Sequence, residues 1–125
     1  MIDHISIATP DLARSGAFYD AVFAPLGMVR ITDRAGTIGY GKRYPEFWLN
    51  LRPKMSPRDA DPGDHICLRA KDEATVRACH QAALLAGGAE DRAPGGYQGE
   101  KTGYFAAFFR DPHGAKLEIA TFPRG

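Results

Sequence analysis

The sequence predicts an α+β fold built from two copies of one unit, in which a strand is followed by a helix and three further strands. Residues 3–7 read Asp-His-Ile-Ser-Ile and residues 64–68 read Asp-His-Ile-Cys-Leu, so one strand pattern recurs after 61 positions. An amphipathic helical pattern and then short apolar runs follow each copy. Recurrence at about half the chain length is typical of an internally repeated fold. We therefore expect modules at residues 1–52 and 64–125, with a connector at 53–63.

Composition limits the classes of protein to consider. A chain of 125 residues is large enough to bury a core without disulfides or a structural metal. Its formal charge of +1 comes from 16 basic and 15 acidic residues that are well mixed, which argues against a nucleic-acid or anionic membrane partner. The two cysteines do not form a secreted disulfide framework, and no apolar run approaches the roughly 20 residues that span a bilayer. We expect a soluble cytoplasmic protein with both thiols reduced.

The first half begins with a strand at residues 2–8. Thr9 can cap the following helix with Pro10 at its first position, or Asp11 can be the cap. The helix runs to about residue 26 on an apolar stripe that includes Tyr19 and Phe23, and Gly27 ends it. Residues 28–32, 37–41 and 47–51 are then expected as three short strands.

The second half repeats this order. A helix begins near Asp72 and ends at residues 87–88, and His80 beside its apolar stripe is expected to be satisfied or partly exposed. A short strand near residues 89–92 precedes residues 93–103, which are rich in glycine and are predicted to form a loop. Residues 104–110 and 116–120 read as strands joined by a type I turn at 111–114, in which His113 is expected to be exposed.

Three strands carry a possible metal ligand on their polar face. Because side chains alternate along a strand, His4 and Ser6 oppose Ile5 and Ile7, and His65 and Cys67 oppose Ile66 and Leu68. Glu118 takes the corresponding place in the strand at 116–120. Two imidazoles and a carboxylate are donors that a divalent metal uses, although three ordinary polar residues at strand ends would give the same pattern.

Several motifs together resemble the vicinal oxygen chelate superfamily, the group that includes glyoxalases, bleomycin resistance proteins and extradiol dioxygenases. They are Asp3-His4-Ile5, the helix start from Asp11-Leu12-Ala13-Arg14-Ser15 to Phe18-Tyr19, Asp64-His65-Ile66, and Phe109-Arg110-Asp111-Pro112-His113-Gly114 leading to Leu117-Glu118-Ile119. The resemblance implies two paired βαβββ modules that form an open, curved mixed-sheet barrel around a cavity. It implies metal ligands on the first and fourth strands of each module, and a homodimer, because family members pair modules within or between chains.

Carried over position by position, the resemblance makes His4, His65 and Glu118 the metal ligands. The remaining ligand position falls on Trp48, which cannot bind a metal. Glu46 or Asn50 would fill it only if the alignment moved by two residues. A carboxylate at that position belongs to the glyoxalase I pattern, so its absence argues against authentic glyoxalase activity.

A site of two histidines and one glutamate instead resembles those of extradiol dioxygenases and fosfomycin-resistance transferases. Such a site leaves positions free for a substrate that binds through two neighbouring oxygens. The ligand set favours iron(II), manganese, zinc or nickel over calcium. The reaction stays open between lyase or isomerase chemistry and oxygenation, with Glu118 as a catalytic residue. The alternative is a metal-free protein that binds a small antibiotic-like molecule.

The expected cavity is largely apolar, which suits a small organic ligand. Trp48 and Phe108 supply aromatic lining, Asn50 shares the face of Trp48, and Cys67 lies nearby as a small buried residue rather than as a nucleophile. Tyr97 and Tyr104 flank the glycine-bearing loop. Each can donate a hydrogen bond from its phenol to a bound oxygen, or serve only in packing. Tyr104 is the candidate catalytic residue of the two.

Overall fold

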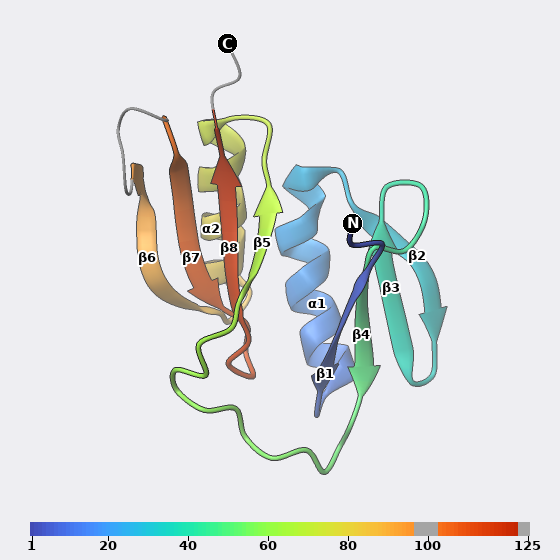
Figure 1. Cartoon of the computed structure of the whole chain (residues 1–125). Helices are drawn as coiled ribbons and strands as arrows, with labels where there is room; N and C mark the ends of the chain where they lie inside the picture. The colour runs from blue at the N-terminus through green and yellow to red at the C-terminus, as the bar shows by residue number, and fades with distance from the viewer. Residues whose placement is uncertain (97–102, 123–125) are drawn as a thin grey trace.

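The computed structural model describes residues 1–96 and 103–122, and these form two sheets of four strands with one long helix against each (Figure 1). The first half supplies one sheet and the second half supplies the other. Both helices lie on the same side of the molecule, and the opposite face of each sheet carries no helix (Figure 1). This arrangement confirms the α+β architecture expected from the repeat.

The first sheet has the strand order β1-β4-β3-β2. Its elements in chain order are β1 (Ile5–Thr9), α1 (Leu12–Phe23), the 3₁₀ helix η1 (Ala24–Leu26), β2 (Val29–Arg34), β3 (Thr37–Gly41) and β4 (Phe47–Leu51). β1 pairs in parallel with β4, and the other pairs are antiparallel. The helical crossover after β1 makes the parallel pairing possible, since parallel neighbours need a long connection.

The second sheet repeats this topology with the order β5-β8-β7-β6. Its elements are β5 (Ile66–Arg69), α2 (Glu73–Leu85), β6 (Ala89–Gly96), β7 (Phe105–Arg110) and β8 (Lys116–Thr121). β5 pairs in parallel with β8, as β1 pairs with β4. Matching pairings in both halves confirm that the repeated sequence pattern corresponds to a repeated structural unit.

Both long helices begin at an aspartate. Asp11 accepts a hydrogen bond from the backbone N–H of Arg14 at 3.0 Å, and Asp72 accepts one from Thr75 at 2.8 Å. Asp11 is therefore the cap of α1, whereas the Thr9 hydroxyl is hydrogen-bonded to Ser15 at 2.6 Å. α1 ends earlier than expected because the chain tightens into η1 at Pro25, which lacks an N–H to continue the helix.

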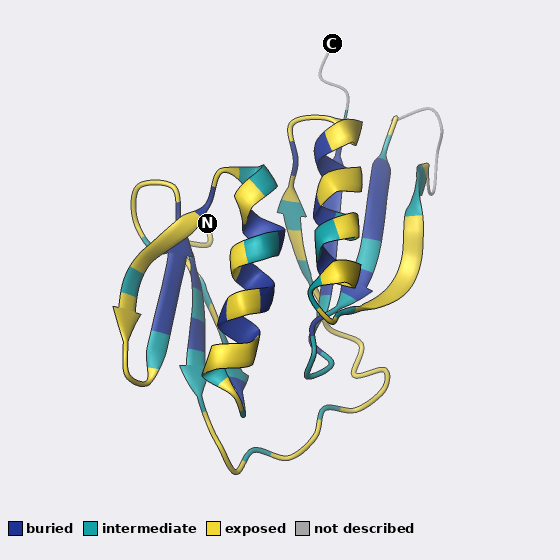
Figure 2. Ribbon diagram, turned by 180° about the vertical axis from the view of Figure 1, so that it is seen from behind, coloured by how far each residue is buried: buried dark blue, intermediate teal, exposed yellow. Residues whose placement is uncertain are grey.

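A single core joins the two halves. The buried faces of both helices point toward the sheets (Figure 2). Phe18 of α1 packs edge-on against Phe109 of β7, with ring centroids 6.2 Å apart. Next to this contact, the Tyr19 hydroxyl donates a 2.7 Å hydrogen bond to Asp111 in the turn before β8. Helix α1 is thus fixed to the second half of the chain as well as to its own sheet.

Side-chain alternation along the strands separates a core face from an open face. In β8, Leu117 and Ile119 belong to the core, so Glu118 between them points to the open side of the sheet. In β4, Phe47 and Leu49 belong to the core, so Trp48 points to the open side. Polar and aromatic candidate residues therefore lie on the faces that no helix covers.

Three details differ from the sequence expectations. β1 begins at Ile5 and β5 at Ile66, so His4 and His65 both precede their strands. β6 continues to Gly96, beyond the expected end at 92. Its register against β7 shifts between Arg92 and Gly95, and such irregularities let a proline and glycines pair at a sheet edge. Residues 97–102 of the expected loop lie outside the described residues.

His113 is half-buried rather than exposed. The turn that carries it packs against the connector, since a Cβ placed on Gly114 would lie 3.7 Å from Cβ of Arg58. Among the described residues, no helix has both the length and the apolar character needed to cross a membrane.

Candidate functional site

The open face of the second sheet brings three predicted site residues into contact. His65 Nε2 lies 2.8 Å from Glu118 Oε1, and the Tyr104 hydroxyl donates to Glu118 Oε2. Glu118 comes from β8, His65 precedes β5, and Tyr104 precedes β7. These positions converge because β8 lies between β5 and β7 in the sheet. Sequence positions separated by up to 53 residues thus meet at one carboxylate.

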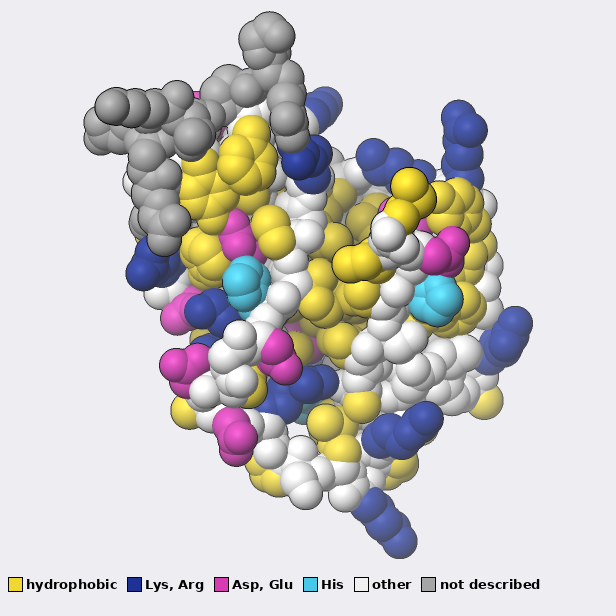
Figure 3. Space-filling view, viewed as in Figure 1, with side chains coloured by type: hydrophobic (Ala, Val, Ile, Leu, Met, Phe, Trp, Pro, Cys, Tyr) yellow, Lys and Arg dark blue, Asp and Glu magenta, His cyan; other side chains and the backbone are white. Residues whose placement is uncertain are grey.

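Two further predicted residues flank this carboxylate in the sheet register. Cys67 of β5 pairs with Glu118 on one side, and Phe108 of β7 pairs with it on the other. The His65 and Phe108 rings are 5.8 Å apart. Figure 3 views the molecule onto the open faces and shows acidic and histidine side chains beside hydrophobic ones over the second sheet. The site therefore combines a carboxylate and an imidazole with an aromatic wall.

Glu118 is only 6% exposed, so its carboxylate oxygens need hydrogen-bond partners within the protein. Both carboxylate oxygens have one, in His65 and Tyr104. Burial raises the pKa of Tyr104 well above its usual value, and the hydrogen bond to Glu118 raises it further. The Tyr104 hydroxyl consequently keeps its proton and acts as a hydrogen-bond donor at neutral pH.

Cys67 is exposed, whereas the sequence suggested a small buried residue. It lies on the face of β5 opposite the core contacts of Ile66 and Leu68, and within the described residues no helix covers that face. Desolvation of the thiol, followed by the neighbouring Glu118 carboxylate, raises the pKa of Cys67 to about 12. The thiol stays protonated at neutral pH, which disfavours a role as a nucleophile or thiolate ligand.

Aromatic rings and cations extend the site beyond the predicted residues. Arg92 and Lys116 lie over the Phe108 ring, at 5.8 and 5.4 Å from its centroid. The Tyr104 ring stacks on Phe122 with centroids 5.0 Å apart. Sequence reasoning did not select Arg92, Lys116 or Phe122. Strand alternation offered a signal for Lys116, which lies two residues before Glu118 and so shares its face.

The other predicted residues lie elsewhere. His4 precedes β1 in the first sheet, is exposed, and contacts Asp3 through its Nδ1 at 2.7 Å. Trp48 and Asn50 lie on the open side of β4, and Tyr97 lies outside the described residues. Across residues 1–96 and 103–122, no three His, Cys, Asp or Glu side chains come together as a set of metal ligands. One chain therefore brings together His65 and Glu118 but not His4.

The family model described as "Glyoxalase/Bleomycin resistance protein/Dioxygenase superfamily" matches residues 1–119. The chain belongs to this superfamily. A search of curated proteins found no match.

Solved structures of the superfamily share the fold over nearly the whole chain. A glyoxalase/bleomycin resistance protein from Albidiferax ferrireducens T118 is 25% identical, with a TM-score of 0.82 over 97% of this chain and 98% of that one. A lactoylglutathione lyase from Agrobacterium tumefaciens is 20% identical, with a TM-score of 0.68 over 97% and 92%. A glyoxalase/dioxygenase from Nostoc punctiforme is 18% identical, with a TM-score of 0.73 over 99% and 92%.

Within this superfamily member, the register shows which residue of the first sheet corresponds to Glu118. Cys67 pairs with Glu118 in the second sheet, and Ser6 pairs with Trp48 in the first. Since Ser6 and Cys67 each follow their histidine by two residues, Trp48 occupies the place of Glu118. Asn50 lies two residues further along and accepts a 2.6 Å hydrogen bond from Thr37. The two halves share a backbone plan, but only the second half has a carboxylate at this place.

His65 and Glu118 are suited to a first-row divalent metal by donor type, since they offer an imidazole nitrogen and a carboxylate oxygen on one face. Their contact across 2.8 Å directs both donor atoms toward the same point of this face. The third ligand that the resemblance implies, His4, directly precedes β1 of the other sheet. A three-ligand site with the implied set therefore requires His4 in addition to the His65–Glu118 pair.

Proposed function

We propose that this protein is a metal-dependent enzyme that binds a small organic substrate through neighbouring oxygens, with His65 and Glu118 as two ligands and His4 as the third. The reaction is of the lyase or isomerase type, or of the dioxygenase type. One observation carries the proposal, the contact between His65 Nε2 and Glu118 Oε1 on the open sheet face beside Tyr104. A nitrogen and oxygen donor set favours zinc, iron(II), manganese or nickel.

When bound, the cation supplies positive charge that stabilises negative charge developing on the substrate oxygens. The chain's own residues orient the ligands and shape the pocket. Tyr104 holds one oxygen of Glu118 and so fixes the direction of the carboxylate. Because Tyr104 retains its proton, this hydroxyl can either keep its bond to Glu118 or turn to donate to a substrate oxygen. Phe108 beside His65 and Phe122 beside Tyr104 restrict water at this face.

A homodimer in which one copy supplies His4 to the His65–Glu118 pair of the other completes the ligand set. His4 is exposed, and large apolar side chains near it and on β2 are exposed too. Ile2 is 80% exposed, and Val29 and Ile31 are 60% and 39% exposed. Apolar side chains grouped on one half favour a partner surface.

The free cysteines also agree with a cytoplasmic protein.

Elemental analysis of freshly purified protein tests the metal. We expect one divalent ion per site in the wild type, and its loss in His65→Ala and in Glu118→Ala. The matched control is His80→Ala, because His80 also contacts a carboxylate at 2.8 Å, that of Glu90, but away from the site. Metal absent from the wild type after reconstitution, or retained in both site variants, would contradict the proposal.

Mixing variants tests the shared site. His4→Ala and His65→Ala proteins each lack one ligand, but a mixed dimer has one complete site if ligands come from two copies. We expect mixing and refolding the two to restore metal binding to about half of the mixed dimers' sites. A monomer by light scattering, or no restoration on mixing, would refute the shared arrangement while leaving single-chain metal binding open to the first test.

A metal-free binding protein is the second candidate. Both oxygens of Glu118 already have partners, in His65 and Tyr104, so the apo arrangement is satisfied without a cation. This candidate expects an aromatic or antibiotic-like ligand to bind equally well before and after treatment with a chelator. Binding that depends on added metal would exclude it.

A further inference from the structure

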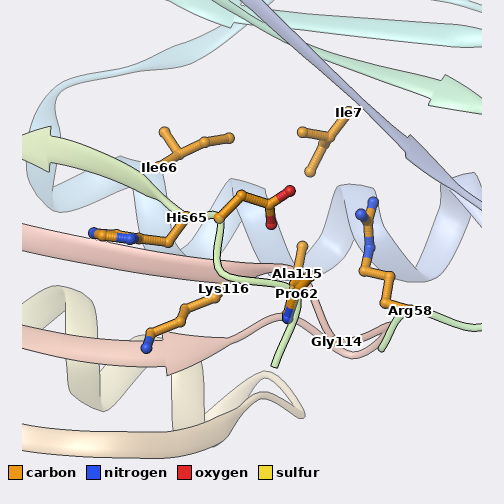
Figure 4. A pocket seen from close by; sticks show the side chains of 9 residues that line it. Ile7, Arg58, Pro62, His65, Ile66, Gly114, Ala115 and Lys116 are labelled. Atoms are coloured by element: carbon orange, nitrogen blue, oxygen red, sulfur yellow. The ribbon is translucent and has the colours of Figure 1, made fainter. Parts of the chain in front are cut away.

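A cavity of about 180 Å³ lies where the two halves meet the connector (Figure 4). Its apolar lining includes Ile7 of β1, Ile66 of β5, Pro62 and Ala115. Arg58 and Asp64 of the connector region line it as well. His65 borders the cavity, but its ring points away from Arg58 (Figure 4). The cavity therefore lies beside the face on which His65 meets Glu118, and Arg58 and Asp64 line it away from that contact.

Charge pairing divides the ionisable side chains that line this cavity into two groups. His65 pairs with Glu118, and Lys116 pairs with Asp91 at 2.9 Å, so both have partners outside the cavity. Within the described part of the chain, neither Arg58 nor Asp64 forms an ion pair. The cavity thus offers one positive and one negative group, each without an opposite charge in contact.

Arg58 is held in place but is incompletely satisfied. Its Nη2 donates a 2.8 Å hydrogen bond to the Ala8 carbonyl, which fixes the guanidinium beside β1. Its Nε is shielded from solvent and has no hydrogen-bond partner. The Asp111 carboxylate is not an acceptor for this N–H; its Oδ2 accepts from Tyr19 and its Oδ1 from the backbone N–H groups of His113 and Ala115. A buried N–H without an acceptor is unfavourable, and a small rotation of the guanidinium toward an acceptor in the cavity would remove that penalty.

We propose that this cavity binds a small zwitterion, an α-amino acid whose carboxylate is held by Arg58 and whose ammonium group is held by Asp64. Arginine suits a carboxylate because its planar donors match two oxygens. The side chain of the amino acid lies against the apolar residues Ile7 and Ile66. An apolar cavity of about 150 Å³ is known to hold benzene, so the volume here suits an amino acid no larger than about valine.

Titrations followed by ¹⁵N–¹H NMR of the full chain test the proposal. The probes are L-alanine, propanoate, which lacks the ammonium group, and ethylamine, which lacks the carboxylate. We expect L-alanine to shift the amide signals of Ile7, Ile66 and Ala115 saturably, with a Kd below about 10 mM. Propanoate and ethylamine should each bind at least about tenfold more weakly, because each loses one charge-assisted contact. Equal affinity for propanoate and L-alanine, or saturable shifts only on β7 and β8, would overturn the proposal.

Variants separate the two contacts. Asp64→Asn, at an exposed position, should weaken the binding of L-alanine about tenfold and leave the affinity for propanoate unchanged. Arg58→Gln should weaken the binding of both probes. Arg52→Gln is the matched control, since Arg52 directly precedes the connector, does not line the cavity, and its side chain donates to the Leu51 carbonyl at 2.8 Å. If Arg58→Gln fails to fold, Pro62→Trp, at an exposed position of the cavity lining, should fill the cavity and abolish the shifts. Binding of L-alanine with wild-type affinity in both Asp64→Asn and Pro62→Trp would refute the assignment.

Discussion

Replacing Tyr19 by Phe should destabilise the protein by removing one buried hydrogen bond between its halves. The Tyr19 hydroxyl donates to Asp111 at 2.7 Å, and the two residues are 0% and 5% exposed. Burial, followed by the Asp111 carboxylate, raises the pKa of Tyr19 well above its usual value, so the hydroxyl keeps its proton and donates at neutral pH. Phenylalanine retains the ring packing against Phe18 and Phe23, so no cavity larger than the lost oxygen forms.

The expected loss follows from the charge of the acceptor. Hydrogen bonds to charged groups contribute about 1.5–3 kcal/mol to stability. The cost of leaving a buried acceptor without its donor is of similar size. We expect Tyr19→Phe to lower the free energy of unfolding by about 2 kcal/mol. A domain of 125 residues has an unfolding entropy of about 0.26 kcal/mol/K, so its Tm should fall by about 8 °C.

Urea denaturation followed by circular dichroism measures this loss, with Tyr40→Phe as the matched control. The Tyr40 hydroxyl donates to the Gly16 carbonyl at 3.0 Å and to Asp20 at 2.9 Å. Asp20 is exposed and keeps its bonds from Arg30, so Tyr40→Phe should cost about 1 kcal/mol. If Tyr19→Phe proves no more destabilising than Tyr40→Phe, the bond to Asp111 does not fix α1 to the second half as argued.

Three further predictions concern individual side chains. Glu118→Gln should speed iodoacetamide labelling of Cys67 at pH 8, because loss of the carboxylate lowers the Cys67 pKa from about 12 and so increases the thiolate fraction. Glu90→Gln should leave the labelling rate unchanged. Gly39→Ala should shift the fluorescence of Trp48, the single tryptophan, since the new Cβ would lie 2.8 Å from the indole, and Gly36→Ala, with nothing within 4 Å, should not. Hydrogen bonds from Thr75 lower the pKa of Asp72 below its usual 3.8. Asp72→Asn should therefore unfold at a lower urea concentration than the wild type above pH 3.8, and this difference should disappear as the pH falls through the lowered pKa. Equal denaturation midpoints at pH 7 would contradict this prediction.

Local patterns predicted the faces of the strands well. Alternation placed Ile66 and Leu68 toward the core and Cys67 on the opposite side of β5, and the structure agrees. The same reasoning placed Glu118 and Trp48 on open faces. These predictions succeeded because the direction of a side chain in a strand depends on its immediate neighbours.

Features that depend on contacts across the chain were less predictable. Cys67 was expected to be buried, but whether a sheet face is covered depends on what packs on it, which alternation does not reveal. His113 was expected to be exposed, but the connector packs on its turn. The meeting of Tyr104 with Glu118 depends on the pairing of β7 with β8, and the separation of His4 from His65 depends on how the halves are arranged. The metal site that joins these histidines stays a prediction.

The strand order has a consequence for the order in which the chain can fold as it is synthesised. β5 is the edge strand next to β8, so residues 66–69 have no ladder partner until residues 116–121 leave the ribosome. β1 finds its partner β4 much sooner, which lets the first sheet form while the second is still incomplete. During that interval α1 exposes the face that later receives Phe109 and Asp111. A nascent chain stalled before β8 should therefore be the form that chaperones and proteases recognise.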